Sequence, residues 1–397
     1  MNNTFKVAIV GGGAAGLLCA IELLLGANAL NGEEIVILER NDRVGKKLIA
    51  TGNGQGNLTN KSVKPENYHG DKGFIRAFFP MLDEVNLVNY LENLGIFLTE
   101  KEEGKMYPVS CQAGAVLDVL RSFLAHKNCK IITGYYVDKI EKGKDFFSIC
   151  SKNEKVFAEN LVLAFGGMAG KQYGTDGSSY SLIEKFGHKK TKTYPSLIQL
   201  KADLREFKNL KGIKEKVKVK GFVDGKMVSL EEGDLLFTDF GVSWSAIFKT
   251  SAHLDFERKN SISIEFVPDL SSEELTSLLE RKLKLDYIEN EEILSGIVNK
   301  QIGKIIARKS ANIGEMINLL KDYKLDITGS LGFDYAQVTK GGIVTDDVNP
   351  FTFQSKLVKN MYLAGELLNV DGDCGGYNLT FAFASGILCA KNIKNRY

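Results

Sequence analysis

The sequence feature that most restricts the fold is a glycine-rich turn near the start of the chain. Residues 5–10 are an apolar run typical of a buried strand; Gly11, Gly13 and Gly16 follow it, and Glu39 ends the next apolar run. In such a unit the first glycine permits the tight turn, the second lets backbone N–H groups approach a pyrophosphate, and the third lets the helix pack on the sheet. Glu39 is placed to accept hydrogen bonds from a ribose diol. The pattern predicts a dinucleotide site; a glycine-rich turn beside an exposed glutamate is the alternative.

Two later strand-like runs also end in glycine. Residues 163–167 read LAFGG, and residues 361–366 read MYLAGE and end in a carboxylate. A nicotinamide dinucleotide domain needs only the first fingerprint. Sequences with all three resemble flavoproteins of the two-dinucleotide-binding type, in which the last carboxylate contacts the ribityl chain. The expected cofactor is therefore FAD.

Two more polar, glycine-rich segments are candidates for cofactor contacts. In residues 44–60 a flexible loop could wrap a cofactor, and Lys46 and Lys47 could meet phosphates; a solvated surface loop is the alternative. Residues 371–376 form a loop before a helix expected over 379–390, which Asn378 could cap. If this loop faces the isoalloxazine, the positive end of the helix would stabilise negative charge at the N1 and O2 edge of the reduced flavin. An ordinary loop before a packed helix is the alternative.

Periodicity along the chain predicts an α/β protein with an insertion. Amphipathic helices are expected over 85–94 and 115–124, and strands over 131–137, 146–150 and 160–165. The middle of the chain is expected to be mainly β, with a half-exposed strand over 211–220 and further strands over 234–240 and 261–267. A capping box at Ser271 and Glu274 starts a helix, and helical patterns continue from 291 to about 325. Beyond Gly341 the N-terminal pattern of strands and helices returns.

Composition narrows the class of protein further. The formal net charge of +2 is too small to concentrate nucleic acid or an anionic membrane, so no polymer partner is expected. The six cysteines show no CxxC and no metal-ligand spacing, which predicts buried free thiols in a reducing compartment and no metal site. The apolar run 9–27 contains Glu22 and four early glycines, so neither a membrane span nor a signal peptide fits, and a cytoplasmic location is expected.

Five segments, taken in order, carry a family resemblance: GKKLIATGNGQGN, LAFGGMAGKQYGTDG, LLFTDFGVS, VTKGGI and AGELLNVDGDCGGYNLTFAFASG. They resemble the bacterial FAD-dependent oxidoreductases that include the 3-dehydro-bile acid delta(4,6)-reductase, also described as aminoacetone oxidase-like or NAD(P)/FAD-dependent flavoproteins. The resemblance covers essentially the whole chain. It implies a Rossmann-like FAD-binding domain of the glutathione-reductase type, with an inserted β-barrel-like domain and a small helical domain. The expected ranges are 1–192 and 338–397, then 193–270 and 326–337, and then 271–325.

The resemblance also implies which residues contact the cofactor. The expected set is Gly11, Gly13, Ala14, Ala15, Gly16, Glu39, Arg40, Lys46, Lys47, Leu48, Gly52, Asn53, Val137, Gly166, Gly167, Gly365, Glu366, Asp371, Gly376, Asn378 and Leu379.

The chain departs from the family pattern at several positions. Gln55 and Gly56 stand where members usually have Arg and Cys, Asp239 where they usually have His, and Trp244 and Ser245 where they usually have Gly and Pro. Asp239 lies in the insertion, where substrate selection is plausible.

The expected reaction is hydride transfer through flavin N5 between a nicotinamide donor, bound transiently, and a small organic substrate, such as an enone or alkene. Reduction of an alkene needs a proton donor, and Lys105, Tyr107, Asp239 and Tyr377 are chemically able, although the sequence does not rank them. Two other functions remain open. One is an FAD-dependent oxidase that uses oxygen, and the other is a flavin-bound nucleic-acid-binding or sensory protein without turnover.

Overall fold

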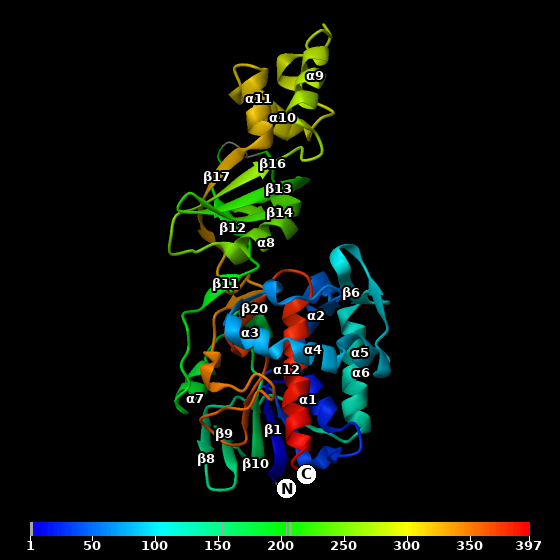
Figure 1. The fold of residues 1–397 in the computed structure, drawn as a ribbon, viewed down its shortest axis with the longest axis vertical. Helices are drawn as coiled ribbons and strands as arrows, with labels where there is room; N and C mark the ends of the chain where they lie inside the picture. Colours follow the sequence, from blue (N-terminus) through cyan, green and yellow to red (C-terminus); the bar gives the residue numbers. More distant parts are fainter. Residues whose placement is uncertain (1–2, 153, 204, 206–208) are drawn as a thin grey trace. The chain divides into compact units, whose positions relative to one another are not determined.

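The chain divides into two compact units (Figure 1). The computed structural model describes residues 3–152, 154–203, 205 and 209–397. Unit 1 consists of Met1–Tyr194 and Val338–Tyr397, and unit 2 consists of Pro195–Gln337. Both ends of the chain belong to unit 1. The finer division of the chain into three domains remains a prediction.

A seven-stranded sheet forms the centre of unit 1. Its parallel strands are β7 (Lys130–Ile132), β2 (Ile35–Leu38), β1 (Thr4–Val10), β10 (Glu154–Leu163) and β19 (Met361–Leu363), in this spatial order. The N-terminal half of β10 pairs instead with β9 (Phe147–Ser151), which pairs with β8 (Lys139–Lys142), both antiparallel. The parallel strands are almost continuously apolar because helices cover both faces of such a sheet.

The carboxyl ends of three parallel strands meet in register. Val10 pairs with Leu163, and Leu163 pairs with Leu363. The chain that follows β1 runs through Gly11 into α1 (Ala14–Leu23), and β2 lies on the other side of β1. The strand order therefore reverses at β1, which is where open α/β sheets bind ligands.

Helix α1 packs along the C-terminal helix α12 (Tyr377–Lys394), as Figure 1 shows. The two helices approach so closely that a Cβ on Gly386 would lie 2.1 Å from the backbone oxygen of Ala15. At the other end of α1 the buried Glu22 forms an ion pair with Lys394, with a distance of 2.6 Å between the Lys394 nitrogen and the carboxylate oxygen. These contacts fix both ends of α1 against α12.

The remaining helices and strands complete unit 1. They are α2 (Lys46–Ile49), β3 (Thr59–Asn60), β4 (Tyr68–Gly70), α3 (Lys72–Phe78), α4 (Pro80–Val85), α5 (Leu87–Asn93), β5 (Leu98–Glu100), β6 (Lys105–Pro108), α6 (Ala113–His126), α7 (Tyr180–Glu184), β18 (Val338–Lys340) and β20 (Val370–Gly372). Strand β11 (Tyr194–Ser196) carries the chain out of this unit. Strand β4 pairs with β20, and β3, β6 and β5 form a small sheet.

Unit 2 contains a closed six-stranded barrel. Its strands, in order around the barrel, are β12 (Leu200–Ala202), β15 (Gly241–Ser243), β14 (Lys226–Phe237), β13 (Lys214–Val223), β16 (Asn260–Glu265) and β17 (Tyr323–Ser330). Helix α8 (Ser245–His253) packs on β13 and β14, and helices α9 (Ser272–Lys282), α10 (Lys300–Lys309) and α11 (Ile313–Lys321) lie at one end of the barrel (Figure 1). The predicted α/β fold with a Rossmann-like FAD-binding part and a barrel-like insertion is confirmed.

The predicted half-exposed strand is confirmed by β13, in which the valines and the glycine are buried and the lysines are not. Its lysines face acidic residues on β14: Lys214 pairs with Asp234 at 2.9 Å, and Lys216 with Glu232 at 3.4 Å. The capping box of α9 is also confirmed, since Ser271 accepts from the Glu274 N–H group at 3.1 Å.

Three predicted elements differ from the structure. The helix expected over 85–94 is broken at Asn86, whose φ of 43° ends α4 and starts α5. The strand expected over 131–137 ends at Ile132, because the chain turns at Gly134 with a φ of 70° and Tyr135 donates its N–H to Glu39. Strand β17 begins at Tyr323, inside the range with helical periodicity.

All six cysteines are free thiols, as predicted, but only Cys19 and Cys389 are buried, so the expected burial is wrong for the other four. No helix in the described part of the chain is long and apolar enough to cross a membrane.

Candidate functional site

The turn between β1 and α1 contains two kinds of glycine. A Cβ on Gly11 would lie 2.4 Å from the Ala164 oxygen, and one on Gly16 would lie 2.0 Å from the Gly11 oxygen, so the chain's own packing requires both. Around Gly13, by contrast, no described atom lies within 4 Å of the Cβ position. Gly13 is the N-cap of α1 and provides no capping side chain. The unpaired N–H groups of this helix end suit a phosphate that approaches over Gly13.

Glu39 is held at this turn. One of its oxygens accepts from the Gly12 N–H group at 2.8 Å, and the other accepts from the Asn41 N–H at 2.8 Å and the Asn41 side chain at 2.7 Å. Glu39 is buried, so the alternative of an exposed glutamate beside a glycine turn is wrong. The carboxylate is fixed next to the helix end, where a ribose would follow a pyrophosphate.

Arg40 ties this turn to the loop after β10. It donates to both oxygens of Asp176, at 2.8 and 3.1 Å, and its guanidinium lies 4.8 Å from the centre of the Tyr136 ring. Burial raises the pKa of Asp176, but hydrogen bonds from Arg40 and Ser178 outweigh it and lower that pKa to about 2. Val137 is buried in the segment beyond Tyr136.

Glu366 lies at the end of β19 and is held from two sides. Lys47 donates to one oxygen at 2.6 Å, and the Thr339 N–H donates to the other at 2.9 Å. Gly167 packs against Thr339 and Glu366 so closely that a Cβ there would lie 2.4 Å from the Thr339 hydroxyl. Lys46 pairs with Asp42 at 2.5 Å. The structure therefore brings the loop over 44–60 together with the segment over 361–366 through Lys47 and Glu366.

The loop over 44–60 packs against the loop before α12. Gly52 and Asn53 adopt left-handed backbone conformations, with φ of 57° and 55°. The Asn60 side chain donates to the Gly375 oxygen at 3.1 Å, and a Cβ on Gly376 would lie 2.4 Å from the Thr59 oxygen. Because Thr59 and Asn60 are buried, the alternative of a wholly solvated loop is wrong for this end of the segment.

The predicted capping role of Asn378 is wrong. Helix α12 starts at Tyr377 with Gly376 as its N-cap, and no side chain of the described residues caps it. Asn378 accepts from the Gly372 N–H at 2.8 Å and donates to the Gly372 oxygen at 2.7 Å. It closes the loop over 372–376 instead of capping the helix.

Asp371 is the most unusual side chain in this region. It is 1% exposed, and neither of its oxygens has a hydrogen-bond partner among the described residues. Burial raises its pKa to about 6; His69 and Lys340 lower it less, and Asp373 and Glu366 raise it further. A buried carboxyl without a donor is costly, so this one calls for a group from outside the chain. The hydroxyl and N–H groups of FAD are suitable donors to this carboxyl. The N-termini of α1 and α12, whose N-caps are glycines without a capping side chain, also fit a bound FAD.

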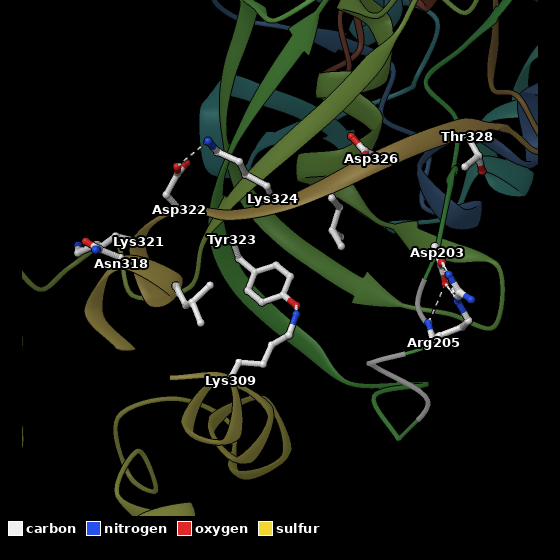
Figure 2. A pocket seen from close by; sticks show the side chains of 12 residues that line it. Asp203, Arg205, Lys309, Asn318, Lys321, Asp322, Tyr323, Lys324, Asp326 and Thr328 are labelled. Carbon is white, nitrogen blue, oxygen red and sulfur yellow. Dashed lines mark hydrogen bonds and ion pairs between the residues drawn. The ribbon is translucent and has the colours of Figure 1, made fainter. Parts of the chain in front are cut away.

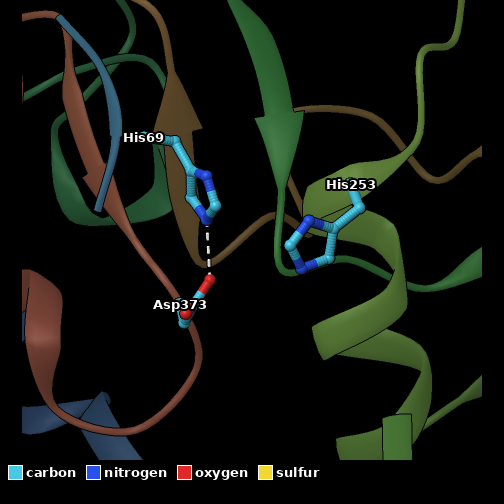
Figure 3. A group of neighbouring side chains, drawn as sticks. All are labelled: His69, His253 and Asp373. Carbon is cyan, nitrogen blue, oxygen red and sulfur yellow. Dashed lines mark hydrogen bonds and ion pairs between the residues drawn. The ribbon is translucent and has the colours of Figure 1, made fainter. Parts of the chain in front are cut away.

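His69 and Asp373 form a hydrogen-bonded pair beside Asp371 (Figure 3). The His69 Nε2 lies 2.7 Å from an Asp373 oxygen, and the Asn67 side chain donates to the other oxygen at 3.3 Å. Sequence reasoning missed His69, because a single histidine within a three-residue strand carries no motif. Only the pairing of β4 with β20, which are about 300 residues apart in the chain, reveals it.

The proton donors considered from the sequence have different surroundings. Lys105 and Tyr107 lie on β6, where Lys105 pairs with Glu103 at 2.6 Å and Lys101 lies over the Tyr107 ring. Tyr377 is the first residue of α12, and burial raises its pKa. Asp239 belongs to unit 2, where it is well exposed and pairs with Lys211 at 2.5 Å.

Unit 2 has a groove of about 990 Å³ along β17 (Figure 2). It is lined by residues of both charges: Asp203, Arg205, Lys309, Lys321, Asp322, Lys324 and Asp326, with Asn318, Leu319, Tyr323, Leu325 and Thr328. Lys309 donates to the Tyr323 hydroxyl at 3.0 Å. None of the expected cofactor residues lines this groove, since all of them belong to unit 1.

Comparisons with known proteins agree with this geometry. The family model described as HI0933-like protein Rossmann domain matches residues 5–392. The 3-dehydro-bile acid delta(4,6)-reductase of Clostridium scindens is 33% identical over 98% of this chain and 99% of its own length. The ribosomal RNA dihydrouridine synthase of Haemophilus influenzae is 26% identical over 98% of both chains. Among solved structures, 3-ketosteroid delta1-dehydrogenase from Sterolibacterium denitrificans shares the fold over the full length of both chains, with a TM-score of 0.52 and 12% identity.

Proposed function

The chain belongs to the HI0933-like Rossmann family and is an FAD-dependent oxidoreductase, and we propose that it reduces a carbon–carbon double bond conjugated to a carbonyl group, with NAD(P)H as electron donor. The names of two relatives support this substrate chemistry. One is named for reducing double bonds of a 3-dehydro-bile acid, and the other for making dihydrouridine, in which the double bond next to a uracil carbonyl has been reduced.

The observation that carries the proposal is the arrangement at the carboxyl ends of β1, β10 and β19. The Gly12 N–H donates to Glu39 at 2.8 Å, and Lys47 donates to Glu366 at 2.6 Å, which joins the loop over 44–60 to the segment over 361–366. Glu39 would bind the adenosine ribose, the N-terminus of α1 the pyrophosphate, and Glu366 the ribityl chain. The residues of the expected set would thus follow one extended dinucleotide.

Bound FAD would supply hydride transfer between the nicotinamide donor and the substrate. The chain's own groups would orient the cofactor and stabilise charge. The N-terminus of α12 has no capping side chain among the described residues and follows the loop that contains Asp371. Its N–H groups would favour an anionic cofactor edge, as helix N-termini favour anions in general.

The substrate is proposed to be a small molecule rather than RNA. The lysines of β13 face acidic residues of β14, as in the pairs of Lys214 with Asp234 and Lys216 with Glu232. A strand whose charges are balanced in this way attracts phosphates weakly. Two relatives are nevertheless named ribosomal RNA dihydrouridine synthases, so RNA belongs in the test.

The test follows the flavin absorbance of the purified holoenzyme without oxygen. NADH and NADPH are first compared as reductants; the reduced enzyme is then mixed with 4-androstene-3,17-dione, uridine, ribosomal RNA or oxygen. We expect a yellow protein that a nicotinamide reduces and a conjugated carbonyl compound reoxidises with loss of its double bond. Fast peroxide release as the sole reoxidation would identify an oxidase instead, and a folded protein that takes up no FAD would refute the assignment.

A further inference from the structure

We propose that His69, oriented by Asp373, is the group that donates a proton to the substrate carbon next to the carbonyl. This inference deepens the proposed function and rests on it. It gives a role to a cluster that the sequence did not reveal, formed by His69, Asp371 and Asp373.

The pairing of β4 with β20 brings the cluster together. His69 is the direct cross-strand partner of Asp371, so the two side chains stand on the same face of the ribbon. Asp373 lies two residues beyond Asp371, and its N–H donates to the Asn67 oxygen at 2.9 Å, which continues the antiparallel pairing. With a period of two along a strand, Asp373 faces the same way, and its 2.7 Å contact with His69 agrees.

The same face belongs to the expected cofactor site. Glu366 is close enough to Asp371 to influence its ionisation, and Asp371 is itself in the set expected to contact FAD. Asp371 is 1% exposed and neither of its oxygens has a hydrogen-bond partner among the described residues, so this face is built for a ligand. His69 and Asp373 flank that carboxyl and are partly open, with side-chain exposures of 21% and 28%.

The chemistry needs an acid at this place. When a hydride equivalent, supplied by the nicotinamide donor through the cofactor, adds to the far carbon of the double bond, the substrate becomes an enolate. A C–H bond must then form at the carbon next to the carbonyl. The protonated His69 ring breaks one N–H bond, keeps the electron pair on its nitrogen and becomes neutral; water restores its proton.

Asp373 acts as a positioning residue. With Nε2 turned to the Asp373 carboxylate, the opposite ring nitrogen, Nδ1, is the one that would transfer the proton. A carboxylate at this distance also fixes the orientation of the ring, as in other histidine–carboxylate pairs.

The test compares the holoenzyme with three variants: His69→Gln, Asp373→Asn and the control His126→Gln. His126 is an exposed histidine at the end of α6. Stopped-flow absorbance measures flavin reduction by the nicotinamide donor, reoxidation by ferricyanide, which forms no C–H bond, and reoxidation by the conjugated carbonyl substrate. Binding of p-chlorophenol to the oxidised enzyme, whose phenolate resembles the enolate, adds a readout that needs no turnover.

We expect His69→Gln to slow only the reoxidation by the carbonyl compound, by about 100-fold or more, and to weaken p-chlorophenol binding. Asp373→Asn is expected to slow the same step by about 10- to 100-fold, and His126→Gln to match the wild type. Equal slowing of the ferricyanide reaction would mean a structural role and refute the inference, as would wild-type substrate reoxidation in His69→Gln. If His69→Gln does not hold flavin, Asp373→Asn decides the comparison. A wild-type flavin that no conjugated carbonyl compound reoxidises would instead refute the proposed function itself.

Discussion

Replacement of Asp371 by asparagine is expected to remove a pH dependence from the stability of the flavin-free chain. Burial raises the pKa of the folded carboxyl from 3.8 to about 6. Protonated Asp371 therefore makes its full contribution to the free energy of unfolding below pH 4, and that contribution is lost as the pH rises through 6. Because each tenfold change in proton affinity corresponds to about 1.4 kcal/mol, ionised Asp371 lowers the free energy of unfolding by about 3 kcal/mol at neutral pH.

Urea unfolding between pH 4 and 8, followed by circular dichroism, measures this contribution. The charged and titratable groups near Asp371 are His69, Lys340, Asp373 and Glu366, and they remain in the variant. The difference between wild type and Asp371→Asn should therefore isolate one carboxyl, and it should grow by about 2 kcal/mol from pH 4 to pH 7, because the unfolded carboxyl is already partly ionised at pH 4. Asp118→Asn, on the exposed face of α6, serves as control.

A difference that does not change with pH would show that Asp371 has a donor in the folded chain and would refute the reasoning. Saturation with FAD provides a second check. If the cofactor donates hydrogen bonds to Asp371, the wild type should gain more stability from FAD at pH 7 than the variant does.

Other variants test the same region by different means. Gly11→Ala should destabilise the chain by at least about 2 kcal/mol, since its Cβ would lie 2.4 Å from the Ala164 oxygen at a φ of 107°, and thermal unfolding measures this. Gly13→Ala should change stability by less than about 1 kcal/mol, because no described atom is within 4 Å, yet weaken FAD binding in a fluorescence titration; equal FAD affinity would contradict the pyrophosphate position. Lys394→Met should cost about 3–5 kcal/mol by leaving Glu22 buried and unpaired, whereas adding Glu22→Leu should recover most of it in urea unfolding.

The strands and glycine turns were predictable because their signals are local. The apolar run of β1, the glycines after it and the glycines at the ends of β10 and β19 are each readable within a few residues, and the fold class followed from them. The break at Asn86 was not readable, because only the backbone conformation shows that one helical period covers two helices. Asn378 shows a related limit: its side chain can cap a helix or close a loop, and tertiary contacts with Gly372 decide between them.

In the candidate site, too, local signals were readable from the sequence and tertiary contacts were not. This difference explains why the cofactor was easier to predict than the proton donor. A dinucleotide is bound largely by backbone N–H groups at strand ends, which require particular residue types such as glycine at short spacing. A proton donor requires only one suitable side chain at the right place, and any element can supply it. His69 reaches Asp373 through the pairing of two three-residue strands, β4 and β20, whose sequences carry no shared motif. Residues 55, 56 and 239, at which the chain departs from its family, did not indicate this pair either, so the structure was needed to find the histidine that the proposed reaction requires.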